Sequence, residues 1–184
     1  PSLAKTVVFG VEDIIVDNEF YNSQTSSFVK VKIGKKAVAI FVLARVDSDQ
    51  FHWVSSNGGK LITLRNGQAI KLLTEGYGFS LISNSMFPRN LLDKDSQEYM
   101  IQLDDPFAIF SQRSFIYNNG IKETLRFGTN IVSTEILEMV SSSSMKWEYE
   151  NYYVLEEATN LPLSARIYFS PLDEPLELIF YYKY

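Results

Sequence analysis

Apolar and polar residues alternate along much of the chain, which is the pattern of half-buried β-strands. In SFVKVKI (27–33) valine and isoleucine alternate with lysine, and in MKWEYE (145–150) methionine, tryptophan and tyrosine alternate with lysine and glutamate. The run AVAIFVLARV (37–46) is apolar throughout, and its β-branched residues and flanking turns favour a central strand covered on both faces. The alternation after 145–150 breaks at residues 151–153, which predicts a bulge there.

Asn-Gly pairs predict tight hairpin turns, because a two-residue type I′ turn needs φ > 0 at both central positions. Asn57-Gly58 and Asn66-Gly67 divide residues 51–73 into three short strands, and Asn119-Gly120 divides residues 114–127 into a further hairpin. Around Asn66-Gly67, the expected register places Arg65 opposite Gln68, Leu64 opposite Ala69 and Thr63 opposite Ile70.

Short helices are expected at three places. Two of them cover residues 5–9 and 19–23, and either Asp17 or Asn18 is placed to cap the second. Asp105-Pro106 has the N-cap and first-turn chemistry of a third helix that continues into FAIFSQ.

The last third of the chain predicts further strands. Residues 131–140 fit either a strand or a helical stripe, and their β-branched content favours a strand. The four serines 141–144 predict a solvated turn. Two more antiparallel strands are expected within 163–170 and 176–184, after a turn in which Asn160 tolerates the left-handed conformation.

These elements amount to roughly ten strands with the turn spacing of all-β domains. The predicted fold class is mainly β, with coiled antiparallel sheets that form a barrel-like or sandwich-like single domain and a few short helices. Residues 1–25 are expected to form an N-terminal arm with short helices, and residues 26–184 a single antiparallel β domain.

The amino-acid composition limits the kinds of partner and functional site that the chain can have. Aromatic residues make up 14% of the chain, which favours strands, and the net charge of −5 argues against a nucleic-acid partner. The chain has no cysteine and one histidine, His52, which excludes thiolate metal sites, histidine triads and multi-histidine metal sites. The residues predict no metal, no cofactor and no catalytic set.

Several motifs together resemble the YjbF/GfcB family of outer-membrane lipoproteins, associated with group 4 capsule and exopolysaccharide. The motifs are VAIFVLARV (38–46), FHWVS (51–55), LITLRNG (61–67), Asn90-Leu91-Leu92, Asp105-Pro106-Phe107-Ala108 and Tyr153-Val154-Leu155 with the closing aromatic strand. The resemblance implies a predominantly β, non-enzymatic lipoprotein on the periplasmic face of the outer membrane. It also implies contact with the membrane only through a lipid anchor upstream of Pro1, and partners among the other components of an envelope polysaccharide export system, or the polysaccharide itself.

Four residues are candidate ligand-binding residues, each with a structural alternative. Glu148 and Glu150 would lie about 7 Å apart on one side of a strand, within reach of paired-carboxylate glycosidase chemistry, although strand alternation explains both as a solvated face. Trp53 beside His52 could form a sugar-stacking platform, but its position favours the core. Arg65 could contact an anionic sugar, and a charge at a strand end is the simpler interpretation.

Three functions follow from these observations. The first is a non-enzymatic protein that assists capsule or exopolysaccharide assembly or secretion. The alternative is a polysaccharide-binding module in which aromatic residues and Arg65 hold an acidic polymer. The third is a glycan-processing enzyme that uses Glu148 and Glu150.

Overall fold

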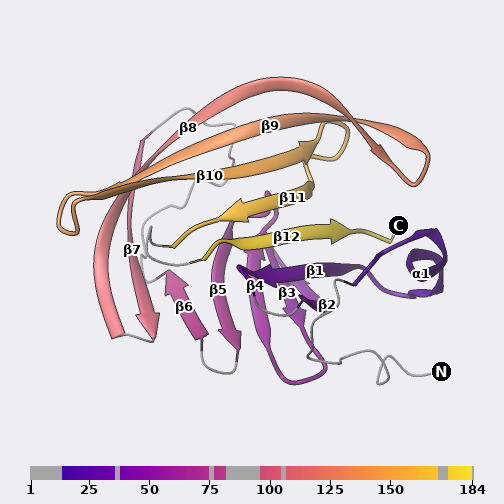
Figure 1. The fold of residues 1–184 in the computed structure, drawn as a ribbon, viewed down its shortest axis with the longest axis horizontal. Coiled ribbons are helices and arrows are strands. Elements are labelled where there is room, and N and C mark those ends of the chain that lie inside the picture. Colours follow the sequence, from indigo (N-terminus) through magenta and orange to yellow (C-terminus); the bar gives the residue numbers. More distant parts are fainter. Residues whose placement is uncertain are drawn as a thin grey trace.

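Twelve antiparallel strands close into a barrel in the computed structural model, which describes residues 14–35, 38–74, 77–81, 96–104, 107–169 and 174–183 (Figure 1). Strands adjacent in the chain pair throughout, and β1 (Phe28–Ile33) pairs with β12 (Leu176–Tyr181) to complete the ring. The other strands are β2 (Val38–Asp47), β3 (Gln50–Val54), β4 (Lys60–Leu64), β5 (Ala69–Thr74), β6 (Tyr77–Leu81), β7 (Gln97–Asp104), β8 (Phe107–Arg126), β9 (Thr129–Ser142), β10 (Trp147–Glu156) and β11 (Pro162–Ile167). The expected mainly β fold class is confirmed in its barrel-like form.

The helix α1 (Asn18–Ser23) precedes the barrel and matches the helix expected at 19–23. Asp17 caps it, because the backbone N–H of Phe20 donates to Asp17 Oδ1 at 2.7 Å. The helix expected at residues 5–9 lies outside the described residues.

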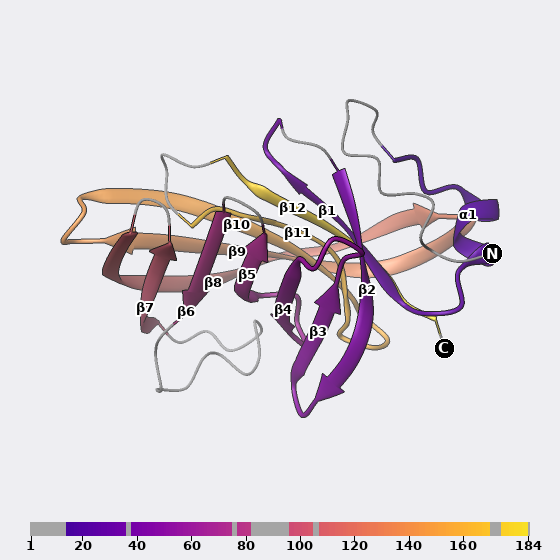
Figure 2. The same cartoon turned by 90° about the horizontal axis from the view of Figure 1, so that it is seen from below.

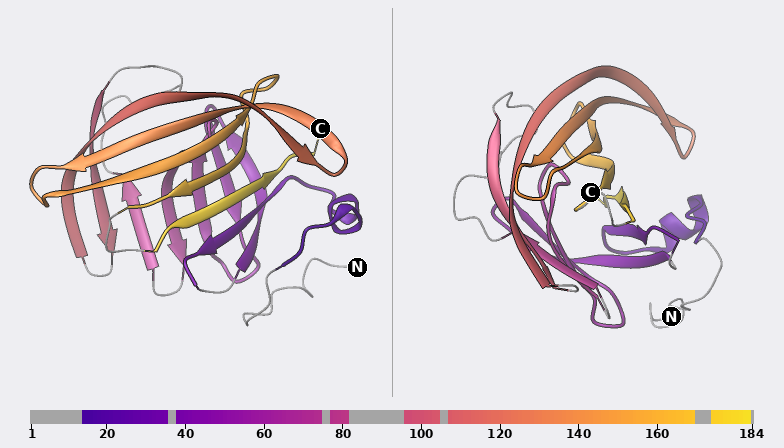
Figure 3. Two further views of the ribbon diagram at one scale, coloured as in Figure 1. Left: turned by 45° about the horizontal axis from the view of Figure 1, so that its top comes forward. Right: turned by 60° about the vertical axis from the view of Figure 1, so that its left-hand side comes forward.

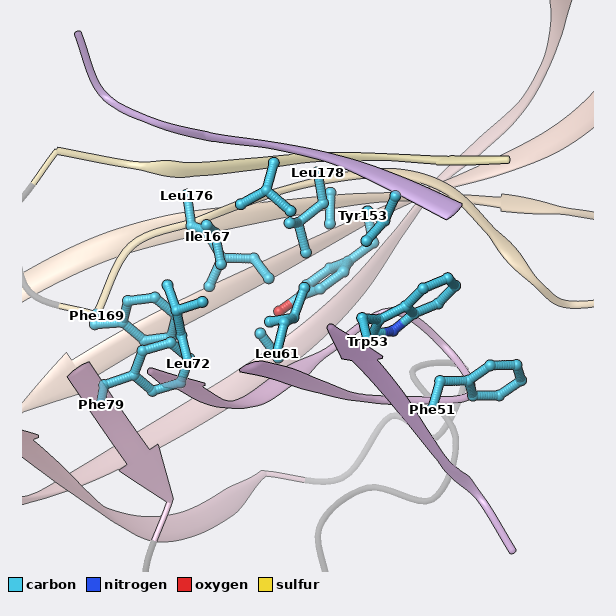
Figure 4. Close-up of a cluster of buried hydrophobic side chains, with 14 of the residues drawn as sticks. Phe51, Trp53, Leu61, Leu72, Phe79, Tyr153, Ile167, Phe169, Leu176 and Leu178 are labelled. Atoms are coloured by element: carbon cyan, nitrogen blue, oxygen red, sulfur yellow. The ribbon is translucent and has the colours of Figure 1, made fainter. Parts of the chain in front are cut away.

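Apolar side chains fill the interior of the barrel (Figure 4). Trp53, Leu61 and Phe180 are each at most 1% exposed although they come from different strands. The indole Nε1 of Trp53 donates to Thr63 Oγ1 at 3.0 Å, which satisfies the polar atom of this large buried ring. Because inward residues alternate with outward ones, the single sheet supplies the whole core.

The apolar run 37–46 forms strand β2, but the prediction that it is covered on both faces is wrong. Val46 is 52% exposed, and the last four residues of β2, 44–47, are all exposed. Figure 2 shows the reason, since the β2–β3 hairpin projects from the barrel and has no second layer over its outer face.

The turn between β4 and β5 has three residues instead of the expected two. Leu64 N donates to Gln68 O at 2.8 Å, and Gly67 N donates to Leu64 O at 2.9 Å. Gly67 has φ +88°, whereas Asn66 does not have positive φ and its side chain accepts from Gln68 N. This is a type I turn followed by a glycine bulge, so Thr63 pairs with Ala69 and the register expected from a type I′ turn is wrong.

Asn119-Gly120 is not a hairpin turn, because β8 continues through it as far as Arg126. Gly120 has φ +104° and forms a bulge opposite β9, and Asn118 Oδ1 accepts from Gly120 N at 2.8 Å. The chain reverses at Phe127-Gly128, where both residues have positive φ. The turn therefore lies eight residues beyond its predicted place, at a pair whose Phe gives no turn signal.

The segment FAIFSQ is the start of β8 and not a helix, and Asp105-Pro106 lies outside the described residues. Inward Phe110 and Gln112 alternate with exposed Phe107 and Ile109, which is strand periodicity. The strand β7 was not anticipated, and its pairing with β8 over eight residue pairs explains why this region adopts the sheet.

The long β8–β9 hairpin extends past the wall of the barrel and bends over one end (Figure 3). It carries the longest pairing of the sheet, from Arg113↔Ser141 to Arg126↔Thr129. The tip of the hairpin lies on the same side as α1 and the C-terminal end of the chain (Figure 1).

Replacing Gly67 by Ala should destabilise the barrel more than the same change at Gly58. Both glycines have positive φ, of +88° and +83°, so both variants carry a backbone cost of about 1–2 kcal/mol. A Cβ at Gly67 would also lie 2.6 Å from Pro162 Cβ, whereas a Cβ at Gly58 meets no atom within 4 Å. Urea unfolding of the two variants measures the difference, and equal midpoints would contradict the close packing of this turn against β11.

Candidate functional site

A cleft of about 350 Å³ opens at the end of the barrel where α1, the β8–β9 tip and β12 meet. Aromatic rings dominate its wall, and polar side chains lie among them. The lining residues are Asn18, Tyr21, Arg126, Phe127, Thr129, Ile131, Glu156, Leu163, Tyr181 and Tyr182.

Tyr21 ties the three walls of the cleft together. Its ring stacks on Phe127 with centroids 4.9 Å apart, and its hydroxyl donates to the backbone oxygen of Tyr182 at 2.7 Å. Lys183 Nζ lies 3.5 Å from the centre of the Tyr21 ring. These contacts join the helix, the hairpin tip and the C-terminal segment, so the cleft is built from parts that are far apart in the sequence.

Arg126 places a guanidinium in this cleft. Its Cζ lies 4.4 Å from the centre of the Tyr181 ring, whose other face stacks on Phe28. Burial lowers the pKa of Arg126, while the electrostatic influence of Tyr181 and hydrogen bonding to its side chain act in the opposite direction. Among the described residues, no carboxylate lies within ion-pair distance of Arg126.

The hairpin turn sets the position of Arg126. Arg126 pairs with Thr129 across Phe127 and Gly128, which have φ +50° and +79°. This two-residue turn matches the twist of the long hairpin, and it directs Phe127 onto Tyr21. A phenylalanine in the left-handed region is uncommon, and such outliers concentrate at functional sites.

A second polar cluster lies inside the barrel around Glu138, which is 1% exposed. Asn151 Nδ2 and the Tyr153 hydroxyl both donate to Glu138 Oε2, at 2.9 and 2.8 Å. Glu138 Oε1 and Ser114 Oγ have no hydrogen-bond partner of good geometry. The bulge expected at 151–153 is wrong, because the alternation continues with Asn151 inward to meet Glu138; the register shift of β10 falls between Val154 and Leu155.

Burial raises the pKa of Glu138 above its ordinary value, against the opposing effect of the hydrogen bonds from Asn151 and Tyr153. Burial and the charge of Glu138 also raise the pKa values of Tyr99 and Tyr153 well above their usual range. These tyrosines stay protonated at neutral pH, so Glu138 is the group of this cluster that titrates in the acid-to-neutral range.

The structure places the four candidate residues from the sequence away from the cleft. Trp53 is 1% exposed and lies in the core, which is the alternative that its position favoured (Figure 4). Arg65 is exposed in the β4–β5 turn. Glu148 and Glu150 are exposed together on the outer face of β10, where Glu150 accepts from the Tyr152 hydroxyl. The structure therefore brings the two glutamates together and keeps them apart from Trp53 and Arg65.

The cleft could not be anticipated from local sequence patterns. Tyr21 precedes Arg126 and Phe127 by about a hundred residues, and both of those residues lie at the end of the hairpin expected over 114–127, whose turn was expected at Asn119-Gly120. Residues with metal-ligating side chains form no group of three anywhere in the described ranges. Within the described residues, no helix is long and apolar enough to cross the hydrocarbon layer of a membrane, since α1 has six residues.

These features define a β-barrel protein with a filled interior and an aromatic, arginine-containing cleft at one end. The chain belongs to the YjbF family, described as group 4 capsule polysaccharide lipoprotein gfcB, whose model matches residues 3–178. The family resemblance expected from the sequence is thereby confirmed. The description names capsule polysaccharide and lipoprotein character.

A solved structure has the same fold. The crystal structure of the hypothetical lipoprotein YmcC from Escherichia coli (K12) superposes with a TM-score of 0.79 and 19% sequence identity, over 92% of this chain and 90% of that chain. A comparison with curated proteins gave no match.

Replacing Glu138 by Gln should make stability less dependent on pH. Because the folded state raises the pKa of Glu138 above its ordinary value of about 4.5, ionisation opposes folding, and wild-type stability should fall as pH rises from about 4.5 through the raised pKa. Gln keeps an acceptor for Asn151 and Tyr153 but carries no charge. Urea unfolding between pH 4 and 8 should show that the variant lacks this decline.

The same change at Glu148 is the control, since that side chain is exposed on the outer face of β10. A Glu138→Gln variant that follows the wild-type pH profile would contradict the assigned cost of burying the carboxylate.

Proposed function

We propose that this protein is a non-enzymatic lipoprotein that assists the assembly or secretion of capsule or exopolysaccharide. It faces the periplasm and is held at the outer membrane by a lipid anchor outside the printed sequence. Its partners are other components of an envelope polysaccharide export system, and nucleic acid is not among them, because the net charge is −5.

Membership of the family over residues 3–178 carries this proposal, because the family is described by capsule polysaccharide and by lipoprotein character. The geometry supports an accessory role. Apolar side chains fill the described interior of the barrel, which leaves its outer surface and its ends for contacts with partners.

A second candidate function is direct binding of polysaccharide, and the cleft beside Arg126 favours it. Aromatic rings with a few polar side chains are the usual lining of a small-ligand site, and the volume of about 350 Å³ lies at the lower end of the range for such sites. The exposed pair Glu148 and Glu150 would serve a glycan-processing enzyme, but neither residue lines the cleft.

Deletion of the gene should reduce the amount of capsule or exopolysaccharide at the cell surface, measured with a polysaccharide-specific stain or by sugar analysis of the surface fraction. Complementation with the wild-type gene should restore it. A deletion strain with unchanged surface polysaccharide would contradict the proposal.

The same complementation assay can distinguish an accessory role from catalysis if the gene carries both Glu148→Gln and Glu150→Gln. The doubly substituted gene should complement as well as wild type, because an exposed carboxylate pair on the outer wall has no part in an accessory role. Failure to complement, with normal protein level, would favour the enzyme hypothesis.

A further inference from the structure

Arg126 is a partly buried cation for which the described protein provides no counter-charge. Its Cζ lies over the Tyr181 ring, 4.4 Å from the ring centre. Two other arginines differ, since Arg113 pairs with Glu98 and Arg45 with Asp47, both on exposed surface. A desolvated guanidinium without an anion is costly, so its retention in a cleft points to an anion that comes from outside.

The guanidinium suits a planar anion. It presents five donors in a fixed fork that matches a carboxylate, and stacking on Tyr181 holds the plane of the fork. Lys183 is not among the lining residues, and its Nζ lies over the Tyr21 ring and donates to the Tyr21 backbone oxygen at 2.6 Å. Glu156 is the carboxylate among the lining residues, and one of its oxygens accepts from the Thr159 hydroxyl.

The rest of the cleft suits a sugar ring. Phe127, which is half-buried, offers apolar ring surface for the C–H face of a pyranose. The Tyr21 ring already contacts Phe127 and Lys183 and supports this wall from behind. Asn18, Thr129 and Glu156 offer donors and acceptors for hydroxyl groups. The cleft thus combines an apolar platform, hydroxyl partners and one cation.

We propose that the cleft binds an acidic sugar residue of a polysaccharide, with the carboxylate of the sugar paired to Arg126. The inference rests on the proposed function for its polysaccharide partner, and it adds the chemical class of the sugar and the residue that selects it. Arg126 selects the charge, and the aromatic wall holds the ring.

The test is a titration of the folded protein with oligogalacturonate, followed by calorimetry and by the aromatic proton resonances of the cleft. Wild type should bind it at least about tenfold more tightly than its carboxyl-reduced counterpart, which has the same ring and no charge. Arg126→Gln should abolish this preference. Arg126→Lys, which keeps the charge and loses the fork, should retain part of it.

Arg45→Gln is the matched control, because it removes an exposed guanidinium whose nearest carboxylate oxygen is 3.8 Å away and leaves the cleft intact. It should bind as wild type does. Thermal unfolding of each variant establishes that it is folded, and Phe127→Leu, with Arg126 intact, should weaken both oligosaccharides alike.

Equal affinity of wild type for the acidic and carboxyl-reduced oligosaccharides, or no binding of either, would overturn the inference. Tighter binding to vesicles of anionic phospholipid, lost in Arg126→Gln, would overturn it in favour of a lipid headgroup. Neither result would contradict the proposed accessory role in polysaccharide assembly or secretion, because that role is tested by the phenotype of the deletion strain. An unchanged phenotype with intact, Arg126-dependent binding would remove the accessory role and leave the acidic-sugar site.

Discussion

The pairing of β1 with β12 is the constraint on which the rest of the molecule depends. Six residue pairs, from Phe28↔Tyr181 to Ile33↔Leu176, close the sheet and remove its free edges. The aromatic end of the chain is therefore an interior part of the ring and not an edge open to a partner. The same closure brings the start of β1 beside the end of β12, and beyond the last pair Lys183 N donates to Ser27 Oγ at 2.8 Å.

The cleft follows from this closure together with the long hairpin. Because β12 lies beside β1, the helix α1 stands next to residues 181–183, and Tyr21 can bond the Tyr182 backbone. The β8–β9 hairpin supplies the remaining wall through a turn with Phe127 in the left-handed region. Such a conformation costs of order 1 kcal/mol or more, and the stacking of Phe127 on Tyr21 is the contact that offsets it.

Local pattern predicted strands well and turns poorly, and the cleft depends on turns. Alternation identified β1 and β10, because each inward position meets the same core. Asn66-Gly67 lies in the predicted turn but with another turn type and register, and Asn119-Gly120 is no turn at all, since Gly67 and Gly120 use positive φ in bulges that a two-residue turn motif does not distinguish. Arg126 could not be anticipated, because its surroundings come from α1 and β12, and no local signal reports contacts across a hundred residues.

Glu138 and Arg126 are both at least partly removed from solvent, but their surroundings suit them to different roles. Glu138 is enclosed by the barrel, and Asn151 and Tyr153 both donate to one of its oxygens. These hydrogen bonds offset much of the free-energy cost of burying the carboxyl group. Arg126 lies in the cleft with its guanidinium over the Tyr181 ring, and no carboxylate in the described chain forms an ion pair with it. A buried acid with internal donors serves the specificity of packing, whereas a half-buried cation that faces a cleft is available to a ligand. The raised pKa of Glu138 is therefore a property of the core, and recognition is assigned to Arg126 on its geometry.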